Sequence, residues 1–565
     1  MYAVPLILHK NNRMRYIIIG GVAGGASTAA RLRRIDEKAE IILFEKGEYI
    51  SYANCGLPYY IGDVIKDREK LFVQTPASFG MRFNIDVRTR AEVVDIDVSK
   101  KTIKVHYLDH DNMELLPFDK LVLSPGAEPI RPPLPGIDLK GIFTLRNVND
   151  TDNIKAYAQK YKKGKAVVIG GGFIGLEMAE NFHHLGMDVT IVEMLPQVMA
   201  PADYAIAAIA QQHIRSKGVH LMLNTAVTGF SNEDGHLTIH LKEKNPLTAD
   251  LVILSIGVRP DTKLAKMASL ELGQAGGIKV NSYMQTSHPD IYALGDAIEF
   301  HNPITGKSMP TYLAGPANKQ GRICADNIVY GNKNTYGGSI NTAIVKIFDL
   351  TVAVAGMASK HLKAAEIDHF TSTTHSGSHA GYYPNAEILS IQLNVQKETG
   401  KLLGAQVIGG EGVDKRIDIL SYIISKGGSI QDLTSFEHAY APPYSSAKDP
   451  VNMAGFVAEN ILTENSEIIY WNEIVPLQSD TLCIDVRSEQ EVAQGAIPGA
   501  INIPIDTLRQ RLHTIPKDKK IVVYCQVGLR GYLAQRILLQ EGYNHVANLS
   551  GGYKTWSNCN AELSA

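Results

Sequence analysis

The chain has 565 residues, of which 45% are apolar and 20% charged, with 56 Lys and Arg against 58 Asp and Glu. At roughly 150 residues per domain this length predicts about four domains, and the composition excludes a mainly disordered, collagen-like or coiled-coil chain. A net charge of −2 gives no field that would gather nucleic acid or anionic lipid, so neither partner is expected. No run of about 18 apolar residues occurs, so no membrane crossing is expected.

Five cysteines are scattered over the sequence, at positions 55, 324, 483, 525 and 559, without a CxxC pair. An odd, dispersed set argues against a disulfide framework and against a zinc site, so we expect a reducing cytoplasm and no metal. The apolar segment Met1–Lys10 is short and has neither a basic start nor a small-residue cleavage site. It is expected to be an extension, or a mis-assigned start before Met14, and not a signal peptide.

Two segments show the pattern strand, glycine-rich turn, helix, strand. In the first, the apolar run Tyr16–Ile19 and a glycine turn precede a helical pattern over Ala26–Arg34 and a second strand, Ile41–Phe44. In the second, Ala166–Ile169 meets another glycine turn, and a helix leads to the strand Val189–Val192. Each βαβ opening predicts a dinucleotide-binding domain, and we expect the second to be inserted into the first.

The acids that follow these turns strengthen the prediction. Glu45 lies 20 residues after Gly25, and Glu193 lies 18 residues after Gly175. A helix N-terminus with glycines can approach a pyrophosphate, and an acid at this spacing accepts hydrogen bonds from ribose hydroxyls. The first turn departs from the pattern, with Val22 where the middle glycine belongs. The alternative is a pair of structural turns that bind no nucleotide.

The later part of the chain changes character. Ile344–Phe348, Val352–Ala355 and Ile388–Leu393 are predicted strands of a mixed sheet, and a helix follows Asn452. After a polar connector at Thr463–Ser466, the C-terminal tail alternates again between strand and helix. Its predicted elements are the strands Leu482–Val486 and Ile521–Tyr524 and a helix over Gly531–Gln540. This tail is predicted to be a separate small α/β domain.

Three short segments assign the cofactors by resemblance. Ile291–Asp296 resembles the motif by which flavoprotein disulfide reductases place an aspartate on the FAD ribityl chain. Leu121–Gly126 and Leu254–Gly257 resemble the crossovers between the FAD and NAD(P) domains of that family. The resemblance then gives FAD to the first module and the nicotinamide to the second. Glu193 would repel a 2′-phosphate and no arginine follows it immediately, which favours NADH over NADPH.

The segment Ser51–Pro58 carries one cysteine, Cys55, and the next thiol is Cys324. Two-cysteine disulfide reductases carry a CxxxxC pair here, so this segment resembles the single-cysteine branch: NADH oxidases, NADH peroxidases and coenzyme A disulfide reductases. The alternative is a buried cysteine of no function. The oxidases and peroxidases place a histidine inside the first glycine turn, where this chain has Ala23. That departure favours the coenzyme A disulfide reductases.

Further matches imply the substrate contacts and the dimer. Arg31 and Arg34 lie at positions i and i+3 of one helix and could meet nucleotide phosphates, although a solvated basic face is the alternative. Ala439–Pro450 resembles the dimerisation signature of the family, which implies a homodimer in which Tyr440 reaches the partner's flavin site. Gly381–Pro384 resembles the segment that supplies a second tyrosine, taken as Tyr382. The resemblance implies substrate contacts from Ser27, Arg31, Arg34, Ser51, Asn54 and Lys448.

The chain departs from the family pattern at one place, because Asn318 and Lys319 stand where a relative has histidine and arginine. The resemblance also implies cofactor-binding positions. They are Gly20, Ala23, Gly24, Gly25, Glu45, Lys46, Asn54, Val93, Asp296, Ala314, Tyr440, Gly170, Gly172, Ile174, Gly175, Glu193 and Gly257.

The C-terminal tail resembles the rhodanese family. The resemblance rests on Ile484–Arg487, on Gly495–Pro504 with Ala496 where histidine is commonest, and on the loop from Cys525 to Arg530. A cysteine between a strand and a helix N-terminus gains N–H donors for its thiolate, and these donors would hold a persulfide. Four residues separate Cys525 from Arg530, whereas tyrosine phosphatases have five, so the loop suits sulfane sulfur and not phosphate. A non-catalytic rhodanese fold is the alternative.

Taken together, these observations predict an α/β protein with two Rossmann-like domains, an α+β dimerisation domain and an α/β rhodanese domain. The expected boundaries are 14–125 with 260–330 for FAD, 126–259 for NAD, 331–455 for dimerisation, 456–472 for a linker and 473–565 for rhodanese.

The expected catalytic residues are Cys55, Cys525, Tyr440, Tyr382 and Arg530. The resemblance to fused coenzyme A disulfide reductase–rhodanese proteins implies reduction of coenzyme A persulfide, polysulfide or coenzyme A disulfide through Cys55, whose stable oxidised form would be a mixed disulfide with coenzyme A. An NADH oxidase with a sulfur-sensing rhodanese domain, or a redox-responsive binding protein, remains the alternative. The ranking of the three acceptors and the route of sulfur between the two cysteines stay open.

Overall fold

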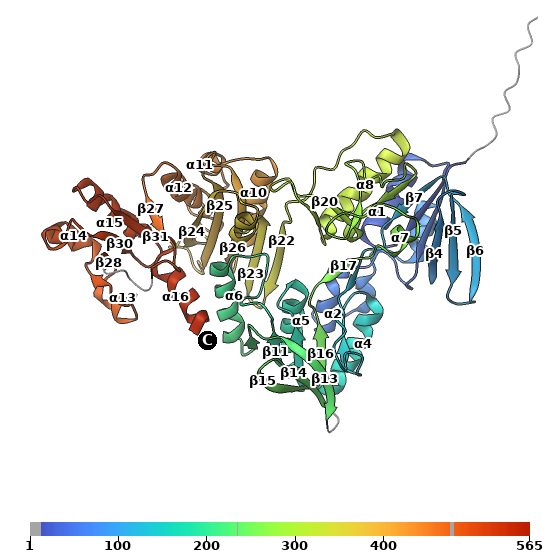
Figure 1. The fold of residues 1–565 in the computed structure, drawn as a ribbon, viewed down its shortest axis with the longest axis horizontal. Coiled ribbons are helices and arrows are strands. Elements are labelled where there is room, and N and C mark those ends of the chain that lie inside the picture. The colour runs from blue at the N-terminus through green and yellow to red at the C-terminus, as the bar shows by residue number, and fades with distance from the viewer. Residues whose placement is uncertain (1–12, 234–235, 475–479, 565) are drawn as a thin grey trace, which may run out of the picture. The chain divides into compact units, whose positions relative to one another are not determined.

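The computed structural model describes residues 13–233, 236–474 and 480–564 (Figure 1). The expected extension Met1–Lys10 lies outside the described residues. The chain divides into two compact units. The first runs up to residue 169 and includes 181–188 and 228–339, and the second holds 170–180, 189–227 and the rest from 340 onward. No helix in the described ranges is long and apolar enough to cross a membrane.

The first unit is built on a parallel sheet in the order β19-β7-β1-β2-β3. Its central strands are almost wholly buried, as expected for a parallel sheet covered on both faces. The first two predicted strands are confirmed, each slightly longer than expected. The strands are β1 (Arg15–Ile19), β2 (Glu40–Glu45), β3 (Asp86–Thr89), β7 (Lys120–Leu123) and β19 (Ile291–Ala293).

Helices cover this sheet, and α1 begins at Ala23 and not at the predicted Ala26. The earlier start depends on glycine, because a Cβ on Gly25 would lie 1.8 Å from the Gly20 carbonyl oxygen. Helix α8 packs against α1, where a Cβ on Gly321 would lie 2.7 Å from the Gly24 carbonyl oxygen. The helices are α1 (Ala23–Ile35), α2 (Leu57–Ile61), α3 (Pro76–Phe83), α4 (Val148–Ala158), α7 (Lys263–Met267) and α8 (Ala314–Tyr330).

Smaller sheets complete the first unit, and most of them are antiparallel. Strands β10 (Lys165–Ile169), β16 (Leu251–Leu254) and β9 (Ile142–Phe143) are parallel and lead to the second glycine turn. The others are β4 (Ala91–Asp97), β5 (Thr102–Tyr107), β6 (Asn112–Pro117), β8 (Ala127–Pro129), β13 (Val227–Glu233), β14 (His236–Leu241), β15 (Lys244–Ala249), β17 (Val258–Pro260), β18 (Ile278–Lys279), β20 (Ile298–His301) and β21 (Ser308–Pro310).

The second unit contains the rest of the nucleotide module and an antiparallel sheet in the order β22-β23-β26-β25-β24. The predicted strand Ile344–Phe348 is Ala343–Ile347, because Phe348 has φ 59° in the turn that follows. The module's elements are α5 (Phe173–His184), β11 (Asp188–Val192), α6 (Tyr204–Ser216) and β12 (His220–Met222). The sheet and its helices are β22 (Ala343–Ile347), β23 (Leu350–Gly356), α9 (Ser359–Ala364), β24 (His369–Gly377), β25 (Ile388–Gln396), β26 (Leu402–Gly409), α10 (Val413–Ser425), α11 (Ile430–Ser435) and α12 (Pro450–Leu462).

A second parallel sheet, in the order β27-β31-β30-β28-β29, forms the C-terminal domain of this unit. Residues 456–472, expected as a linker, contain the end of α12 and strand β27, which pairs with β31. The elements are β27 (Glu467–Ile469), β28 (Thr481–Asp485), α13 (Glu489–Ala493), β29 (Ile501–Asn502), α14 (Ile505–Arg511), β30 (Lys520–Tyr524), α15 (Leu529–Gln540), β31 (Val546–Leu549) and α16 (Gly552–Ser564). Helix α16 packs against α6, where Gln211 Nε2 donates to Glu562 Oε2 at 3.0 Å.

Candidate functional site

The first glycine turn joins β1 to α1 and is closed by the acid at the end of β2. Gly20 has φ 100°, and a Cβ there would lie 2.0 Å from the Ser124 carbonyl oxygen, so only glycine fits. The Gly21 N–H donates to Glu45 Oε2 at 2.9 Å, and the Gly47 N–H donates to Glu45 Oε1 at 2.8 Å. The turn and the acid therefore lie side by side, as a nucleotide-binding site requires.

Asp296 lies in a short 3-10 turn after β19, and burial raises its pKa to about 6. No hydrogen bond to the Asp296 carboxylate from the described residues is found, although the neighbouring Gly295 N–H donates to Gln320 Oε1 at 2.8 Å. A partly buried carboxylate without a protein donor is suited to accept hydroxyl groups of a ligand. This environment fits the flavin contact expected of Asp296.

The other cofactor positions expected in this module lie on several elements. Ala23 and Gly24 open α1, and Ala314 opens α8. Val93 is buried in β4. Lys46 follows Glu45 and pairs with Glu128 at 3.6 Å.

The second glycine turn repeats the first. Gly170 has φ 107°, and the Gly171 N–H donates to Glu193 Oε2 at 2.6 Å. The other carboxylate oxygen, Oε1, accepts the Leu195 N–H at 2.8 Å. A Cβ on Gly172 would meet nothing within 4 Å, so the space in front of this backbone is open to a ligand. Two further expected positions, Ile174 and Gly175, lie in the first turn of α5, and Gly257 has φ 106° after β16.

Cys55 is exposed in a one-turn 3-10 helix, Asn54–Gly56, that runs directly into α2. The preceding segment is tied to the first glycine turn, because the Ser51 N–H donates to the Gly21 carbonyl oxygen at 2.8 Å. The other cysteine of this unit, Cys324, is fully buried in α8, and burial raises its thiol pKa. The segment that leads to Cys55 is therefore fixed at the proposed flavin turn, and the other cysteine of this unit is buried.

The expected substrate contacts on α1 meet α8. The Ser27 hydroxyl donates a hydrogen bond to the side-chain oxygen of Asn318, and Arg31 Nε pairs with Asp326 Oδ1 at 2.6 Å. Arg34 is exposed. Asn318, which stands where a relative has histidine, is therefore a hydrogen-bond partner of Ser27. Of Arg31 and Arg34, only Arg34 has no ion-pair partner among the described residues. Lys448, the remaining expected contact, is exposed in the second unit.

Tyr382 and Tyr440 come from two separate loops of the antiparallel-sheet domain, and their hydroxyl oxygens lie 2.9 Å apart. Both side chains are exposed, at 77% and 47%. The hydrogen bond to Tyr440 raises the pKa of Tyr382, so this hydroxyl keeps its proton at neutral pH. The structure thus brings together the two tyrosines that the sequence placed at one site.

A buried ion pair holds the two tyrosine loops in place, and sequence reasoning missed it. Arg416 Nη2 lies 2.8 Å from Asp449 Oδ2, and their side chains are 2% and 0% exposed. The same guanidinium nitrogen donates to the Ser378 carbonyl oxygen at 2.8 Å, and the Asp449 carboxylate accepts the Ser445 hydroxyl at 2.6 Å. Although burial alone would raise the pKa of Asp449, hydrogen bonds from Arg416 and Ser445 lower it. No local sequence signal pairs residues 33 positions apart.

Cys525 lies where β30 ends, in a tight loop before α15, and is 1% exposed. The Gly528 N–H donates to Cys525 Sγ at 3.2 Å, and Gly528 adopts φ 109°. Arg530 forms a two-point pair with Glu491, at 2.7 and 2.6 Å. This ion pair lowers the pKa of Glu491 to about 2 and raises the pKa of Arg530. The nearby Cys525 also raises the pKa of Arg530. The loop therefore offers an N–H donor and a positive charge near the thiol.

Two supports of this loop were not expected from the sequence. Arg487 pairs with Asp485 at 2.7 Å, both side chains being 2% exposed, and its Nη1 donates to Gln526 Oε1 at 3.2 Å. Glu491 also closes a capping box with Ser488 at the start of α13. The Ser-x-x-Glu spacing of that box is visible in the sequence and could have singled out Glu491.

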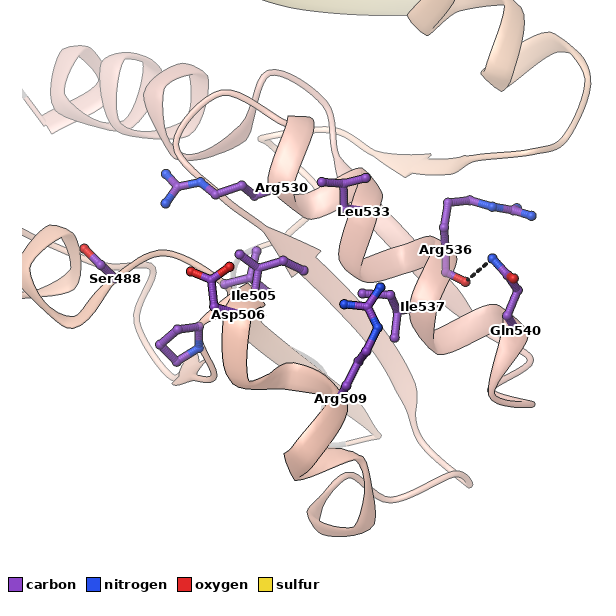
Figure 2. A pocket seen from close by; sticks show the side chains of 11 residues that line it. Ser488, Ile505, Asp506, Arg509, Arg530, Leu533, Arg536, Ile537 and Gln540 are labelled. Carbon is purple, nitrogen blue, oxygen red and sulfur yellow. Dashed lines mark hydrogen bonds between the residues drawn. The ribbon is translucent and has the colours of Figure 1, made fainter.

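A pocket of about 560 Å³ lies in the same domain, between α14 and α15 (Figure 2). Its walls include Ile505, Leu533 and Ile537 beside the charged groups of Arg509, Arg530 and Arg536. Figure 2 shows the guanidinium groups of Arg530 and Arg536 directed to opposite ends of the pocket. The positive charges therefore do not converge on one point.

Comparisons with known proteins match this architecture. Three family models match the chain: pyridine nucleotide-disulphide oxidoreductase over residues 14–318, its dimerisation domain over 342–450, and a rhodanese-like domain over 475–559. The structure of reduced Bacillus anthracis CoADR-RHD is 48% identical, covers 97% of this chain and 99% of its own, and has a TM-score of 0.95. An NAD-dependent persulfide reductase from A. fulgidus is 39% identical over 96% of this chain and 100% of its own, with a TM-score of 0.90.

One relative is shorter than this chain and is covered over its whole length. The coenzyme A disulfide reductase of Staphylococcus epidermidis is 36% identical over 447 residues, which are 79% of this chain and all of that protein. An NADH oxidase of Methanocaldococcus jannaschii is 35% identical over 78% of this chain and 98% of its own.

Proposed function

We propose that this chain, which belongs to the pyridine nucleotide-disulphide oxidoreductase family and carries a rhodanese-like domain, is an NADH-dependent reductase of coenzyme A persulfide, polysulfide or coenzyme A disulfide. The observation that carries the proposal is that one chain holds two thiols in two different environments. Cys55 is exposed four residues after Ser51, whose N–H binds the first glycine turn, whereas Cys525 lies in a loop that offers an N–H donor to its sulfur. The names of the relatives support the same substrate class.

The family uses FAD and NAD(H), and both glycine turns fit these cofactors. The first turn, with Glu45 and Asp296, would hold FAD, and the second, with the open face of Gly172 and with Glu193, would hold the nicotinamide nucleotide. When bound, the flavin supplies the means to pass the electron pair of NADH to a sulfur acceptor.

The geometry of Glu193 supports NADH over NADPH. Its two oxygens already accept the N–H groups of Gly171 and Leu195, so the carboxylate is fixed at the end of β11. A 2′-phosphate at this place would put two negative groups next to each other. The residues that follow, Met194 and Leu195, are exposed and carry no positive charge.

The chemistry at Cys55 requires a thiolate and a source of protons. The Cys55 thiolate would attack a sulfur of the acceptor and form a mixed disulfide with it, while the S–S bond of the acceptor breaks and one thiol or sulfide leaves. The electron pair of NADH would then reduce the mixed disulfide back to two thiols. For a persulfide the overall balance is RSSH + NADH + H⁺ giving RSH + H₂S + NAD⁺. Tyr382 and Tyr440, with their hydroxyl groups 2.9 Å apart, would donate protons to the leaving thiolate. In a homodimer Tyr440 of one protomer would serve the site of the other, and the dimerisation domain supports that assembly.

Cys525 would carry sulfane sulfur as a persulfide. Transfer to coenzyme A balances as Cys525–SSH + CoA–SH giving Cys525–SH + CoA–SSH, so no electron donor is needed. The Gly528 N–H and the charge of Arg530 would stabilise the terminal sulfur. We also propose a cytoplasmic location, which the five scattered cysteines support.

An NADH oxidase is the weaker alternative. A relative carries that name, but Ala23 occupies the position where the oxidase and peroxidase branches have histidine. The decisive assay is steady-state NADH consumption with coenzyme A disulfide, a persulfide or oxygen as the acceptor. Intact mass and cofactor extraction should show FAD and coenzyme A released by reductant.

Matched serine variants separate the two thiols. Cys55→Ser should abolish NADH oxidation by every sulfur acceptor while FAD stays bound. Cys525→Ser should spare reduction of small acceptors and abolish sulfur transfer from thiosulfate to cyanide. Full persulfide reduction by Cys55→Ser would refute the proposed mechanism, and loss of all reductase activity in Cys525→Ser would show that sulfur must pass through the rhodanese domain.

A further inference from the structure

We infer that the edge strand β24 of the antiparallel sheet contributes to the sulfur-carrier site through His375. This side chain holds Thr555, and Thr555 in turn positions the turn at Gly551 and Gly552 that supports the Cys525 loop. This inference rests on the proposed role of Cys525. It concerns how the loop obtains its geometry, and it assigns His375 and Thr555 as positioning residues that need not touch the substrate.

The first step is the covering of the sheet edge by the rhodanese domain. Strand β24 is the last strand of its sheet, so its outer N–H groups need partners from elsewhere. The Thr371 N–H donates to the Tyr470 hydroxyl at 3.0 Å, and the Thr373 N–H donates to Ser550 Oγ at 3.2 Å. Alternate residues of one edge are therefore bound by side chains of the C-terminal region.

His375 is the next alternate residue of this edge and is buried. Its Nδ1 lies 2.7 Å from the hydroxyl of Ser390, the residue paired with it on β25, and its Nε2 lies 2.8 Å from Thr555 Oγ1. Burial lowers its pKa to about 3, and the charge of Lys554 acts in the same direction. A neutral imidazole has one donor and one acceptor nitrogen, and both are used here.

The second step leads from Thr555 to the loop. Thr555 packs on Gly551, where a Cβ would lie 2.1 Å from Thr555 Oγ1 and 3.1 Å from Thr373 Cγ2. The next residue, Gly552, lies under the loop, since a Cβ there would lie 2.5 Å from the Cys525 carbonyl oxygen. Both glycines have positive φ, 71° and 60°, so the turn has one backbone shape that other residues rarely adopt.

The turn then binds the loop backbone directly. The Tyr553 N–H donates to the Cys525 carbonyl oxygen at 2.8 Å, and the Lys554 N–H donates to the Gln526 carbonyl oxygen at 3.0 Å. These two bonds orient the peptides that precede Gly528, whose own N–H reaches Cys525 Sγ. A shift of the turn would therefore lengthen that contact and weaken the stabilisation of the thiolate.

The test measures the reactivity of the Cys525 thiol in the full-length protein. Alkylation by iodoacetamide across pH is followed by mass spectrometry of the tryptic peptide 521–530, which contains no other cysteine. Thr555→Val keeps the branched shape and removes the hydroxyl, whereas Thr555→Ser keeps the hydroxyl. His375→Leu removes the same contact from the sheet side.

Thr555→Val and His375→Leu should each move the midpoint of Cys525 alkylation to higher pH and slow the reaction at neutral pH by roughly three- to tenfold, the effect of losing about one neutral hydrogen bond. Thr555→Ser should follow the wild type. The matched control is His369→Leu, since the ring of His369 on the same strand binds Ser359 Oγ and the Ile367 carbonyl oxygen, each at 2.7 Å, and neither residue belongs to the C-terminal domain. It should leave the profile of Cys525 unchanged.

A wild-type profile in Thr555→Val would overturn the inference, even if His375→Leu fails to fold. Equal effects of His369→Leu and His375→Leu would also overturn it, because a general loosening of the strand would then explain both. A wild-type protein that transfers no sulfur would refute the proposed function of Cys525 and would leave the alkylation result to be judged by itself.

Discussion

The buried pair of Arg416 and Asp449 should be the costliest place to remove one charge from the antiparallel-sheet domain. Asp449→Asn keeps an oxygen for the Val451 N–H, which Asp449 accepts at 2.9 Å, so the cap of α12 survives. It removes the negative charge 2.8 Å from a guanidinium whose side chain is 2% exposed. Leaving a buried charge without its partner costs about 3–5 kcal/mol, and solvent can screen little of it here.

Urea unfolding followed by circular dichroism measures this cost. The control is Asp432→Asn, which weakens an exposed capping box with Ser429 and should cost about 1 kcal/mol or less. The double variant Arg416→Met with Asp449→Asn should recover most of the loss, since no uncompensated buried charge remains. A loss below about 1 kcal/mol for Asp449→Asn would refute the view that this ion pair anchors the two tyrosine loops.

Three further outcomes follow from the contacts described above. Glu193→Gln should narrow the preference for NADH, as the ratio of the two kcat/KM values would show; equal use of NADPH by the wild type would contradict the role given to Glu193. Glu491→Gln should slow sulfur transfer by Cys525 and leave NADH-dependent reduction of small acceptors intact. It should lower the free energy of unfolding by about 1 kcal/mol, because the ion pair with Arg530 is about one-third exposed and partly screened by solvent. Because the pKa of Glu491 is lowered to about 2, this stability is present above its ordinary pKa of 4.5 and is lost as pH falls toward 2, which acid titration of unfolding midpoints would reveal. Folding lowers the pKa of His375 from 6.5 to about 3, so its contribution to the free energy of unfolding is complete above pH 6.5 and declines by at most about 5 kcal/mol as pH falls toward 3. His375→Gln should flatten this decline. Parallel curves of unfolding free energy against pH for the two proteins would show that His375 is not its source.

The sequence alone was sufficient for the features that depend on a few neighbouring residues. The glycines of both turns could be recognised because positive φ at Gly20 and Gly170 leaves almost no other residue possible. The acids Glu45 and Glu193 could be recognised because two parallel strands of a βαβ unit end at the same edge of the sheet. Resemblance supplied the rest, including Cys55, Cys525 and the tyrosine pair, and the family comparisons confirm the architecture on which it rested.

Element boundaries were less well determined, by one to three residues. The start of α1 was missed because Gly24 and Gly25 lower helix propensity, whereas the fold uses them for close packing against the Gly20 carbonyl and Leu294. The strand β27 was assigned to a connector, since its three residues gain their order only by pairing with β31.

Apart from the tyrosine pair, only the tertiary structure decided which distant side chains meet. From the sequence, Arg31 could be interpreted as a phosphate contact or as part of a solvated basic face. The fold instead pairs it with Asp326 across the contact between α1 and α8. Arg416 with Asp449, and His375 with Thr555, carried no pattern at all, although each pair is buried. The physical reason is that an apolar or polar pattern encodes whether a residue is buried, whereas its partner depends on strand order and on how each domain docks on a free edge, and these are properties of the whole folded chain.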